Sequence, residues 1–174
     1  MNYELVEQQI ADRLTTKLGI NFEVAVLPET EEEYKVAFGK SRATVSYKAS
    51  DFATEDRASK AASRGLGAFV TQEEHVIFEI TLQSKKLRGA VGLYAMLEKV
   101  KRALVGYTPT DCQKMQILKF GFIERTENIF TYHMLMSTTT TVVEEEDAQN
   151  LPLITEITAS GDLGESVVPN EIIS

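Results

Sequence analysis

Residues 116–143 read QILKFGFIERTENIFTYHMLMSTTTTVV. Apolar and polar side chains alternate on both sides of a short break at Thr126, Glu127 and Asn128, which predicts two long antiparallel strands joined by a hairpin turn. One face of the first strand, Gln116 to Arg125, would carry Leu118, Phe120 and Phe122. One face of the second strand, Ile129 to Val143, would carry Phe130, Tyr132, Met134 and Met136. These apolar faces need other elements to cover them.

A helix is expected immediately before the hairpin, from Ala90 to Val105. Its apolar side chains recur with the period of one helix face, at Leu93, Leu97, Val100 and Leu104. Lys101 and Arg102 lie in the last turns, where the helix dipole favours cations. Gly106 and Pro109 then end the helix.

The longest strand-like run that precedes this helix is Phe69 to Ser84. One face of that run would carry apolar side chains, at Val76, Phe78, Ile80 and Leu82. The opposite face is mostly polar, with His75, Ile77, Glu79, Thr81 and Gln83. This strand and the hairpin exceed the usual strand length of roughly 5–6 residues. Strands that extend beyond a domain expose edges and faces that a partner must cover.

The N-terminal part of the chain predicts one helix and two shorter strands. Tyr3 to Leu18 has apolar residues every four positions, and Gly19 supplies the stop that helices favour. Phe22 to Val26 and Ala43 to Lys48 alternate as strands do. Ser50 to Gly67 is polar and is expected to be a long connecting arm, a kind of segment that is often functional.

These elements together predict an α+β fold. We expect an antiparallel sheet of about four to five strands, with two main helices packed on one face, a long β-hairpin and an extended C-terminal tail. This arrangement is expected to bury every apolar stripe, including the one on Gln116 to Arg125. A single domain is expected at residues 1–143, followed by an acidic C-terminal extension at residues 144–174.

The net charge of −8 is concentrated in that extension. Residues 144–174 contain eight Asp or Glu and no Lys or Arg, whereas the charges of residues 1–143 balance. Such an acidic end does not bind nucleic acid; it is either solvated or docks on a basic partner surface. The 43% hydrophobic content is enough for a core. No apolar run reaches the roughly 20 residues of a membrane span, and we expect no signal peptide.

The residues most suited to chemistry are two histidines and one cysteine, His75, His133 and Cys112. Both histidines fall on polar strand faces without Asp, Glu or Cys at metal-ligand spacing. Cys112 has no accompanying motif and is expected to be an ordinary free thiol. We therefore predict no catalytic, cofactor-binding or metal-binding residues, and no cofactor. An enzymatic or ligand-binding site remains an alternative if all three side chains meet in one place.

Four other patterns have structural interpretations. Gly65 to Gly67 is half of a dinucleotide fingerprint, and it precedes a strand where the fingerprint must follow one. Gly89 and Gly92 lie near a helix start and are expected to serve close packing there. Glu29 and Glu31 to Glu33 are expected to form a solvated acidic loop. The basic cluster lacks interleaved aromatic residues, so it is a thin nucleic-acid signal; it consists of Lys85, Lys86 and Arg88.

Several segments occur in an order that is typical of one family. They are Arg42 to Ser50, Phe69 to Gln72 with Val76 to Ile80, Leu93 to Pro109, Phe120 to Phe122 and Phe130 to Tyr132. Across roughly residues 3 to 143, these segments resemble the tail-terminator family of Mu-like contractile-tailed phages and related prophage tails. Each segment is a packing pattern, so the resemblance depends on their order and spacing.

The resemblance implies a structural virion protein and not an enzyme. Members of such a family form a homo-oligomeric ring, expected to be hexameric, that caps the tail tube and ends polymerisation of tube and sheath. The implied partners are tail tube and sheath proteins and a neck or connector protein. DNA would pass through the lumen as a non-specific passenger, and no membrane is involved. The expected location is the tail or neck of the virion, with host cytoplasm during assembly. A neck or head–tail connector of the same particle is the alternative.

Overall fold

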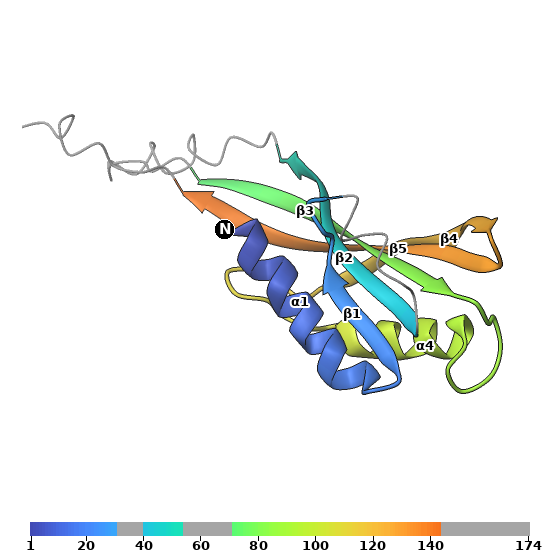
Figure 1. Cartoon of the computed structure of the whole chain (residues 1–174). Coiled ribbons are helices and arrows are strands. Elements are labelled where there is room, and N and C mark those ends of the chain that lie inside the picture. The colour runs from blue at the N-terminus through green and yellow to red at the C-terminus, as the bar shows by residue number, and fades with distance from the viewer. Residues whose placement is uncertain (31–39, 54–70, 144–174) are drawn as a thin grey trace, which may run out of the picture. The chain divides into compact units, whose positions relative to one another are not determined.

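The structure is a computed structural model that describes residues 1–30, 40–53 and 71–143 (Figure 1). All of these residues belong to one compact unit, Met1–Glu144. Its elements in chain order are α1 (Tyr3–Leu18), β1 (Phe22–Val26), β2 (Ser41–Phe52), β3 (Thr71–Ser84), α4 (Leu93–Leu104), β4 (Gln116–Thr126) and β5 (Ile129–Val143). The α+β class, with five strands and two helices, is confirmed.

The five strands form one sheet in the order β1-β2-β3-β5-β4. Our expectation of an antiparallel sheet is corrected at one pair, because β1 and β2 run parallel, from Phe22 beside Ser41 to Val26 beside Val45. The other three pairs are antiparallel. A parallel pair needs a connection of about a dozen residues or more. The stretch from Leu27 to Lys40 is long enough to return the chain to the same end of the sheet.

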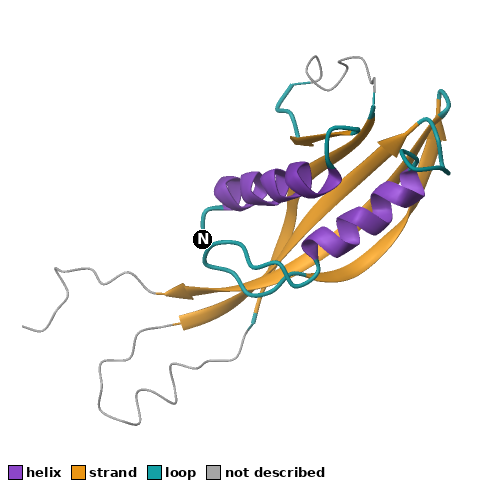
Figure 2. Cartoon of the chain, turned by 90° about the horizontal axis from the view of Figure 1, so that it is seen from below, coloured by secondary structure: helices purple, strands orange, loops and turns teal. Residues whose placement is uncertain are grey.

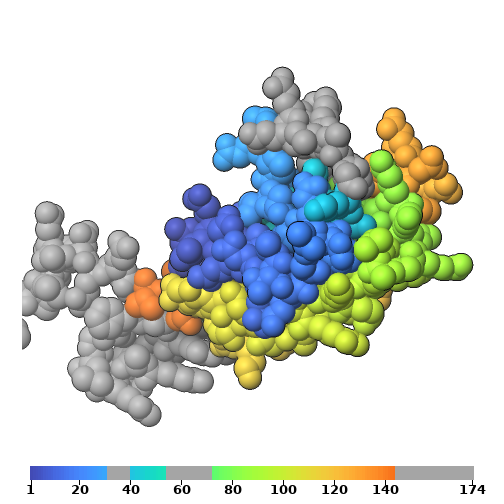
Figure 3. Space-filling model, turned by 60° about the horizontal axis from the view of Figure 1, so that its bottom comes forward, coloured from blue at the N-terminus to red at the C-terminus, as the bar shows by residue number. Residues whose placement is uncertain are grey.

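Both helices lie on the same face of this sheet, as expected (Figure 2). The space-filling view shows the surfaces of α1 and of the region around α4 adjoining on that face (Figure 3). Between helices and sheet lies the core, in which the expected β3 row is completely buried: Val76, Phe78, Ile80 and Leu82. The expected stripe of α4 is buried there too: Leu93, Leu97, Val100 and Leu104.

The two ends of α1 have clear local causes. At the start, the Asn2 side chain accepts a hydrogen bond from the backbone N–H of Leu5 at 3.1 Å, which satisfies one of the free N–H groups of the first turn. At the end, Gly19 has φ 78°, a conformation that glycine adopts without strain. The Tyr3 hydroxyl donates to the Glu74 carboxylate at 2.5 Å, which ties the helix to β3.

α4 begins at Leu93, three residues later than expected, because residues 90–92 still belong to the loop that connects β3 to the helix. The backbone N–H groups of Leu93 and Tyr94 donate to the carbonyls of Lys86 and Leu87, at 2.8 and 3.0 Å. A Cβ on Gly92 would lie 2.4 Å from the Arg88 carbonyl oxygen. This close approach confirms the packing role expected for Gly92. Gly89 has open space around a Cβ position and φ 92°, so the expectation of close packing is wrong there, and the backbone conformation is what favours glycine.

The β4–β5 hairpin closes through a two-residue turn. Glu127 and Asn128 both have positive φ, 48° and 65°, and Thr126 pairs with Ile129. Two positive φ values in a two-residue loop match the twist of the flanking strands. The predicted hairpin is therefore confirmed, although Glu127 is an unusual residue for the position.

Two other expectations change in part. β2 continues to Phe52, so the first residues of the expected arm from Ser50 to Gly67 extend the strand. Residues 54–67 of the arm lie outside the described residues, as do Phe69 and Val70. The acidic residues Glu31 to Glu33 and the C-terminal extension at 144–174 also lie outside them.

The expected burial of the β4 stripe is wrong. Leu118, Phe120 and Phe122 are 55%, 48% and 54% exposed. The reason is a difference in length: α4, with 12 residues at 1.5 Å each, spans roughly 18 Å. β5, with 15 residues at about 3.3 Å each, spans roughly 50 Å. The helices are too short to cover the whole hairpin, whose end projects beyond the α4 region (Figure 3).

Candidate functional site

The most distinctive surface of the described residues is an exposed group of aromatic side chains between α4 and β4. β4 is an outer strand of the sheet and pairs with β5. Phe120 pairs with Met134, and Phe122 pairs with Tyr132. Because Met134 is buried against the helices, both phenylalanines face the same side as the helices.

The side chains of this group contact one another. The rings of Phe122 and Tyr132 are 5.3 Å apart, and those of Tyr94 and Tyr132 are 6.5 Å apart, both edge to face. The Lys101 ammonium lies 4.4 Å from the centre of the Phe120 ring, a favourable cation–π distance. We call these five residues the α4–β4 surface: Tyr94, Lys101, Phe120, Phe122 and Tyr132.

Burial and hydrogen bonding with Tyr94 raise the pKa of Tyr132. Tyr94 is 44% exposed, and Phe120 and Phe122 are 48% and 54% exposed. One ring from the helix and two rings from the hairpin are therefore accessible on the same surface. A group of exposed rings of this kind is typical of a surface that binds another protein.

The outer edge of β4, which pairs with no second strand among the described residues, adds to this surface. The pairing of β4 with β5 is interrupted between Ile117 and Lys119 and again between Phe122 and Glu124. Leu118 and Ile123 occupy these irregular positions and are 55% and 47% exposed. Bulges and a lysine on an edge strand limit uncontrolled pairing with other chains. The outer edge of β4 therefore exposes apolar side chains, while its bulges and its lysine limit pairing with strands of other chains.

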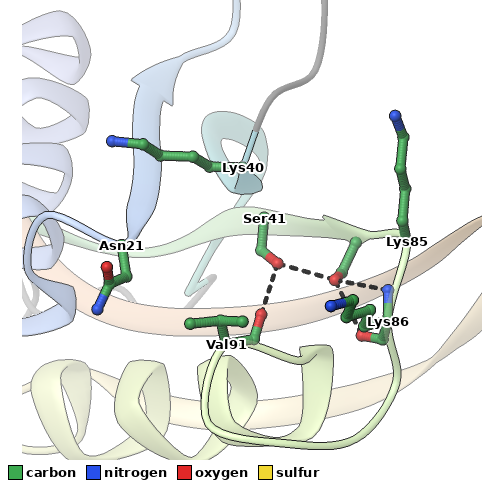
Figure 4. A pocket seen from close by; sticks show the side chains of 7 residues that line it. Asn21, Lys40, Ser41, Lys85, Lys86 and Val91 are labelled. Atoms are coloured by element: carbon green, nitrogen blue, oxygen red, sulfur yellow. Dashed lines mark hydrogen bonds between the residues drawn. The ribbon is translucent and has the colours of Figure 1, made fainter.

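A small pocket of about 290 Å³ lies at the C-terminal end of β3 (Figure 4). It is lined by three lysines, Lys40, Lys85 and Lys86, and by two serines, Ser41 and Ser84. The serine hydroxyls lie 2.8 Å apart. Ser41 also donates to the Val91 carbonyl at 2.8 Å, and Ser84 accepts from the Lys86 N–H at 3.1 Å.

The hydrogen bonds of this pocket are therefore used to attach the loop before α4 to β2. Lys40 donates to the Ile20 carbonyl at 2.8 Å, so its ammonium also has a structural partner. Lys85 points away from the serines (Figure 4). The pocket has a basic rim, but its polar floor is satisfied by the protein itself.

On the sheet face opposite the helices, His133 contacts the Glu79 carboxylate, which is also paired with Lys48. Its Nδ1 lies 3.1 Å from a Glu79 oxygen, and the Lys48 ammonium lies 2.7 Å from the other oxygen. Burial alone would raise the pKa of Glu79, but the contacts with Lys48 and His133 hold it below its ordinary value. This group joins β2, β3 and β5 and has the character of a structural ion pair.

The structure does not bring His75, His133 and Cys112 together. His75 lies beside Thr139, and its Nδ1 is 3.2 Å from the threonine hydroxyl. His133 lies beside Thr81, six positions along β3 from His75, which is roughly 20 Å. Cys112 lies on the helix side of the sheet, with its Sγ 3.6 Å from the Met1 sulfur. The common site that an enzymatic alternative requires is not formed.

The environment of Cys112 does not activate the thiol. Burial raises the pKa of Cys112 above its ordinary value, whereas a nucleophilic cysteine needs a lowered one. Among residues 1–30, 40–53 and 71–143, no group of three or more His, Cys, Asp or Glu is placed to hold a metal ion. In the same described segments, no helix has the length and apolar character needed to span a membrane.

Sequence reasoning identified the side chains of β4 but placed them in the core. The signal that would have found the surface is the length difference, since a helix of 12 residues cannot cover strands of 11 and 15 residues.

Comparison with known proteins identifies the family of the chain. No curated protein matches the chain. A model of the Gp37 protein family matches residues 10–160. The chain therefore belongs to the Gp37 protein family, a phage-related protein family.

Proposed function

We propose that this protein is a phage tail terminator, a structural virion protein that works by assembling into a ring and not by catalysis. The ring, expected to be hexameric, caps the tail tube, ends polymerisation of tube and sheath, and joins the tail to the neck. Its partners are further copies of this chain, tail tube and sheath proteins, and a neck protein. DNA passes through the lumen without being read.

Membership of a phage-related family supports a phage structural protein in general. The observation that carries the finer proposal is the α4–β4 surface, because exposed rings on an open strand edge are suited to permanent contact with protein neighbours. The separation of His75, His133 and Cys112 supports a role without catalysis. The order of sequence segments that resembles tail terminators supports the proposed position at the end of the tail tube.

The experiment is assembly with the tail tube protein of the same particle, followed by electron microscopy. We expect rings at one end of each tube, and tubes that stop growing when this protein is added. The proposal fails if tubes elongate equally with and without the protein and no density appears at their ends. Density located nearer the portal than the tube end would favour the neck or head–tail connector instead.

A matched pair of variants ties this result to the structure. Phe122→Asp places a charge within the α4–β4 surface, and Val142→Asp places the same charge on an exposed residue at the far end of β5. We expect Phe122→Asp to prevent capping and Val142→Asp to cap like the wild type. Circular dichroism is the control that checks whether both variants remain folded.

A further inference from the structure

Exposed lysines gather at the end of the sheet where β1 and β2 begin and β3 ends. Three of them line the pocket described above (Figure 4), and a fourth comes from α4. The ammonium of that fourth lysine lies 4.8 Å from the centre of the Phe22 ring, and Phe22 follows Asn21, which also lines the pocket. We call these residues the lysine surface: Lys40, Lys85, Lys86 and Lys99.

The positive charge of the lysine surface is not neutralised by the residues that the structure describes. None of their carboxylates forms an ion pair with any of its four ammonium groups. The neighbouring Arg42, in contrast, is paired with Glu23 at 2.7 Å. Two apolar side chains adjoin the lysines, Ile20 with 85% and Val91 with 41% exposure. The lysine surface therefore suits an acidic segment that also carries apolar side chains.

The C-terminal extension of this chain, which lies outside the described residues, has that composition. Residues 144–174 contain eight Asp or Glu and no Lys or Arg. They begin with four consecutive acids, Glu144 to Asp147. The first apolar residues of comparable size after this run are Leu151, Leu153 and Ile154. Four carboxylates in a row are electrostatically complementary to four clustered ammonium groups.

The length of the chain decides which copy supplies these acids. Val143, the last residue of β5, pairs with Thr71, the first residue of β3. The lysine surface lies at the opposite end of β3, which has 14 residues at about 3.3 Å each and so spans roughly 45 Å. The four residues after Val143 extend at most roughly 14 Å. The acidic run therefore cannot reach the lysine surface of its own chain.

We infer that residues 144–154 of one copy bind the lysine surface of a neighbouring copy. The acidic run contacts the ammonium groups, and the apolar residues that follow contact Ile20 and Val91. This inference rests on the proposed function, because the ring brings neighbouring copies together. The two contacting regions differ, so the contact is head to tail and can repeat around a closed ring.

Two charge reversals of equal size test the contact from its two sides. The first variant, Lys85→Glu with Lys86→Glu, alters the lysine surface and keeps the acidic run. The second, Glu144→Lys with Glu145→Lys, alters the acidic run and keeps the lysine surface. The control is Lys114→Glu with Lys119→Glu, because both residues are exposed and lie outside the lysine surface. Circular dichroism checks that each variant folds.

The measurement is sedimentation velocity of the full chain, alone and with tail tube protein. We expect each of the two variants to self-associate about tenfold more weakly than the wild type, and the control to associate like the wild type. An equimolar mixture of the two should associate more tightly than either alone, because the unaltered acidic run of the first meets the unaltered lysine surface of the second. Raised ionic strength should weaken wild-type association, since exposed charges are screened.

Four outcomes overturn the inference. A mixture that associates no more tightly than its components would exclude a contact between copies. A control as weak as the two variants would show an effect of net charge alone. Weak association of the first variant only would assign the lysine surface to another acidic partner. Wild-type association of both variants would show a solvated extension.

Electron microscopy of tubes separates this inference from the proposed function. Rings that cap tubes in both variants, with association unchanged, would remove the contact and leave the proposed function intact. A wild-type protein that stays monomeric and never binds tube ends would overturn both.

Discussion

β3 and β4 each carry a row of alternating apolar side chains, but the two rows lie in opposite environments. In β3, Val76, Phe78, Ile80 and Leu82 are completely buried. In β4, Phe120 and Phe122 point to the same side of the same sheet and remain about half exposed. The central strand lies under the helices, whereas the outer strand extends beyond them. Alternation of apolar side chains therefore identifies one face of a strand, and the position of the strand in the sheet decides whether helices cover that face.

The greatest loss of stability is expected in the β3 row, and a matched change in the β4 row should cost much less. Phe78→Ala removes a completely buried ring and is expected to lower the free energy of unfolding by about 3–5 kcal/mol. The matched change Phe120→Ala should cost less than about 1 kcal/mol, because little cavity forms at an exposed site. Urea unfolding followed by circular dichroism measures both. Equal losses of unfolding free energy in the two variants would show that the β3 and β4 rows are equally buried, against this expectation.

The second prediction concerns the polar continuation of the β3 row. Glu74 is 2% exposed and accepts the hydrogen bond of the Tyr3 hydroxyl. Tyr3→Phe removes this donor from a buried carboxylate and is expected to cost about 1–3 kcal/mol at neutral pH. Chemical denaturation of variant and wild type gives the difference. A Tyr3→Phe protein as stable as the wild type would show that the contact is not needed.

The pH dependence of that difference has a definite sign. The hydrogen bond with Glu74 and burial raise the pKa of Tyr3 above its ordinary value of 10.0. A group whose folded pKa is raised contributes stability below its unfolded pKa, and that stability is lost as pH rises through the folded value. The gap between wild type and Tyr3→Phe should therefore be complete at neutral pH and shrink in strongly alkaline solution.

The third prediction moves to the opposite face of β3. The contacts with Lys48 and His133 hold the pKa of Glu79 below its ordinary value of 4.5, against the effect of burial. Glu79→Gln should cost about 0.5–1 kcal/mol at pH 7, as a partly exposed ion pair does. Since a lowered folded pKa stabilises above the unfolded value, the cost should disappear as pH falls through the folded pKa. Unfolding at neutral and acid pH tests this, and a cost that persists in acid would contradict it.

The smallest effect has the opposite direction and concerns the turn that supports β4. Glu127 and Asn128 both hold positive φ, which Asn-Gly adopts most readily. Glu127→Asn combined with Asn128→Gly should therefore stabilise the protein by up to about 1 kcal/mol. The melting temperature measures the change. A lower melting temperature would indicate that the Glu127 side chain contributes something beyond the turn.

Much of the fold was predictable, and the failures have a common cause. The periodicity of Tyr3 to Leu18 and the hairpin turn at Glu127 and Asn128 depend on neighbours in sequence, and both predictions are confirmed. The parallel pairing of β1 with β2 depends on how a connection crosses the sheet, which no local pattern records. The solvent exposure of Phe120 and Phe122 depends on the length of α4, a helix from another part of the chain. The role in the particle stays a proposal on the same ground, because it depends on neighbours beyond this chain.

The candidate surface shows the same division. The sequence predicted which residues of the hairpin are apolar, and it predicted that long strands need a partner. It did not predict that Tyr94 from α4 would meet Phe122 and Tyr132 from the hairpin. It also did not predict that this meeting point would lie at an open edge.

Local periodicity and residue chemistry were enough to predict which segments form helices and strands, which strand faces are apolar and how charge is distributed along the chain. Only the tertiary structure decided which apolar face is core and which is surface. The physical reason is that burial and edge exposure are set by the elements that pack against a strand, and those elements come from distant parts of the chain.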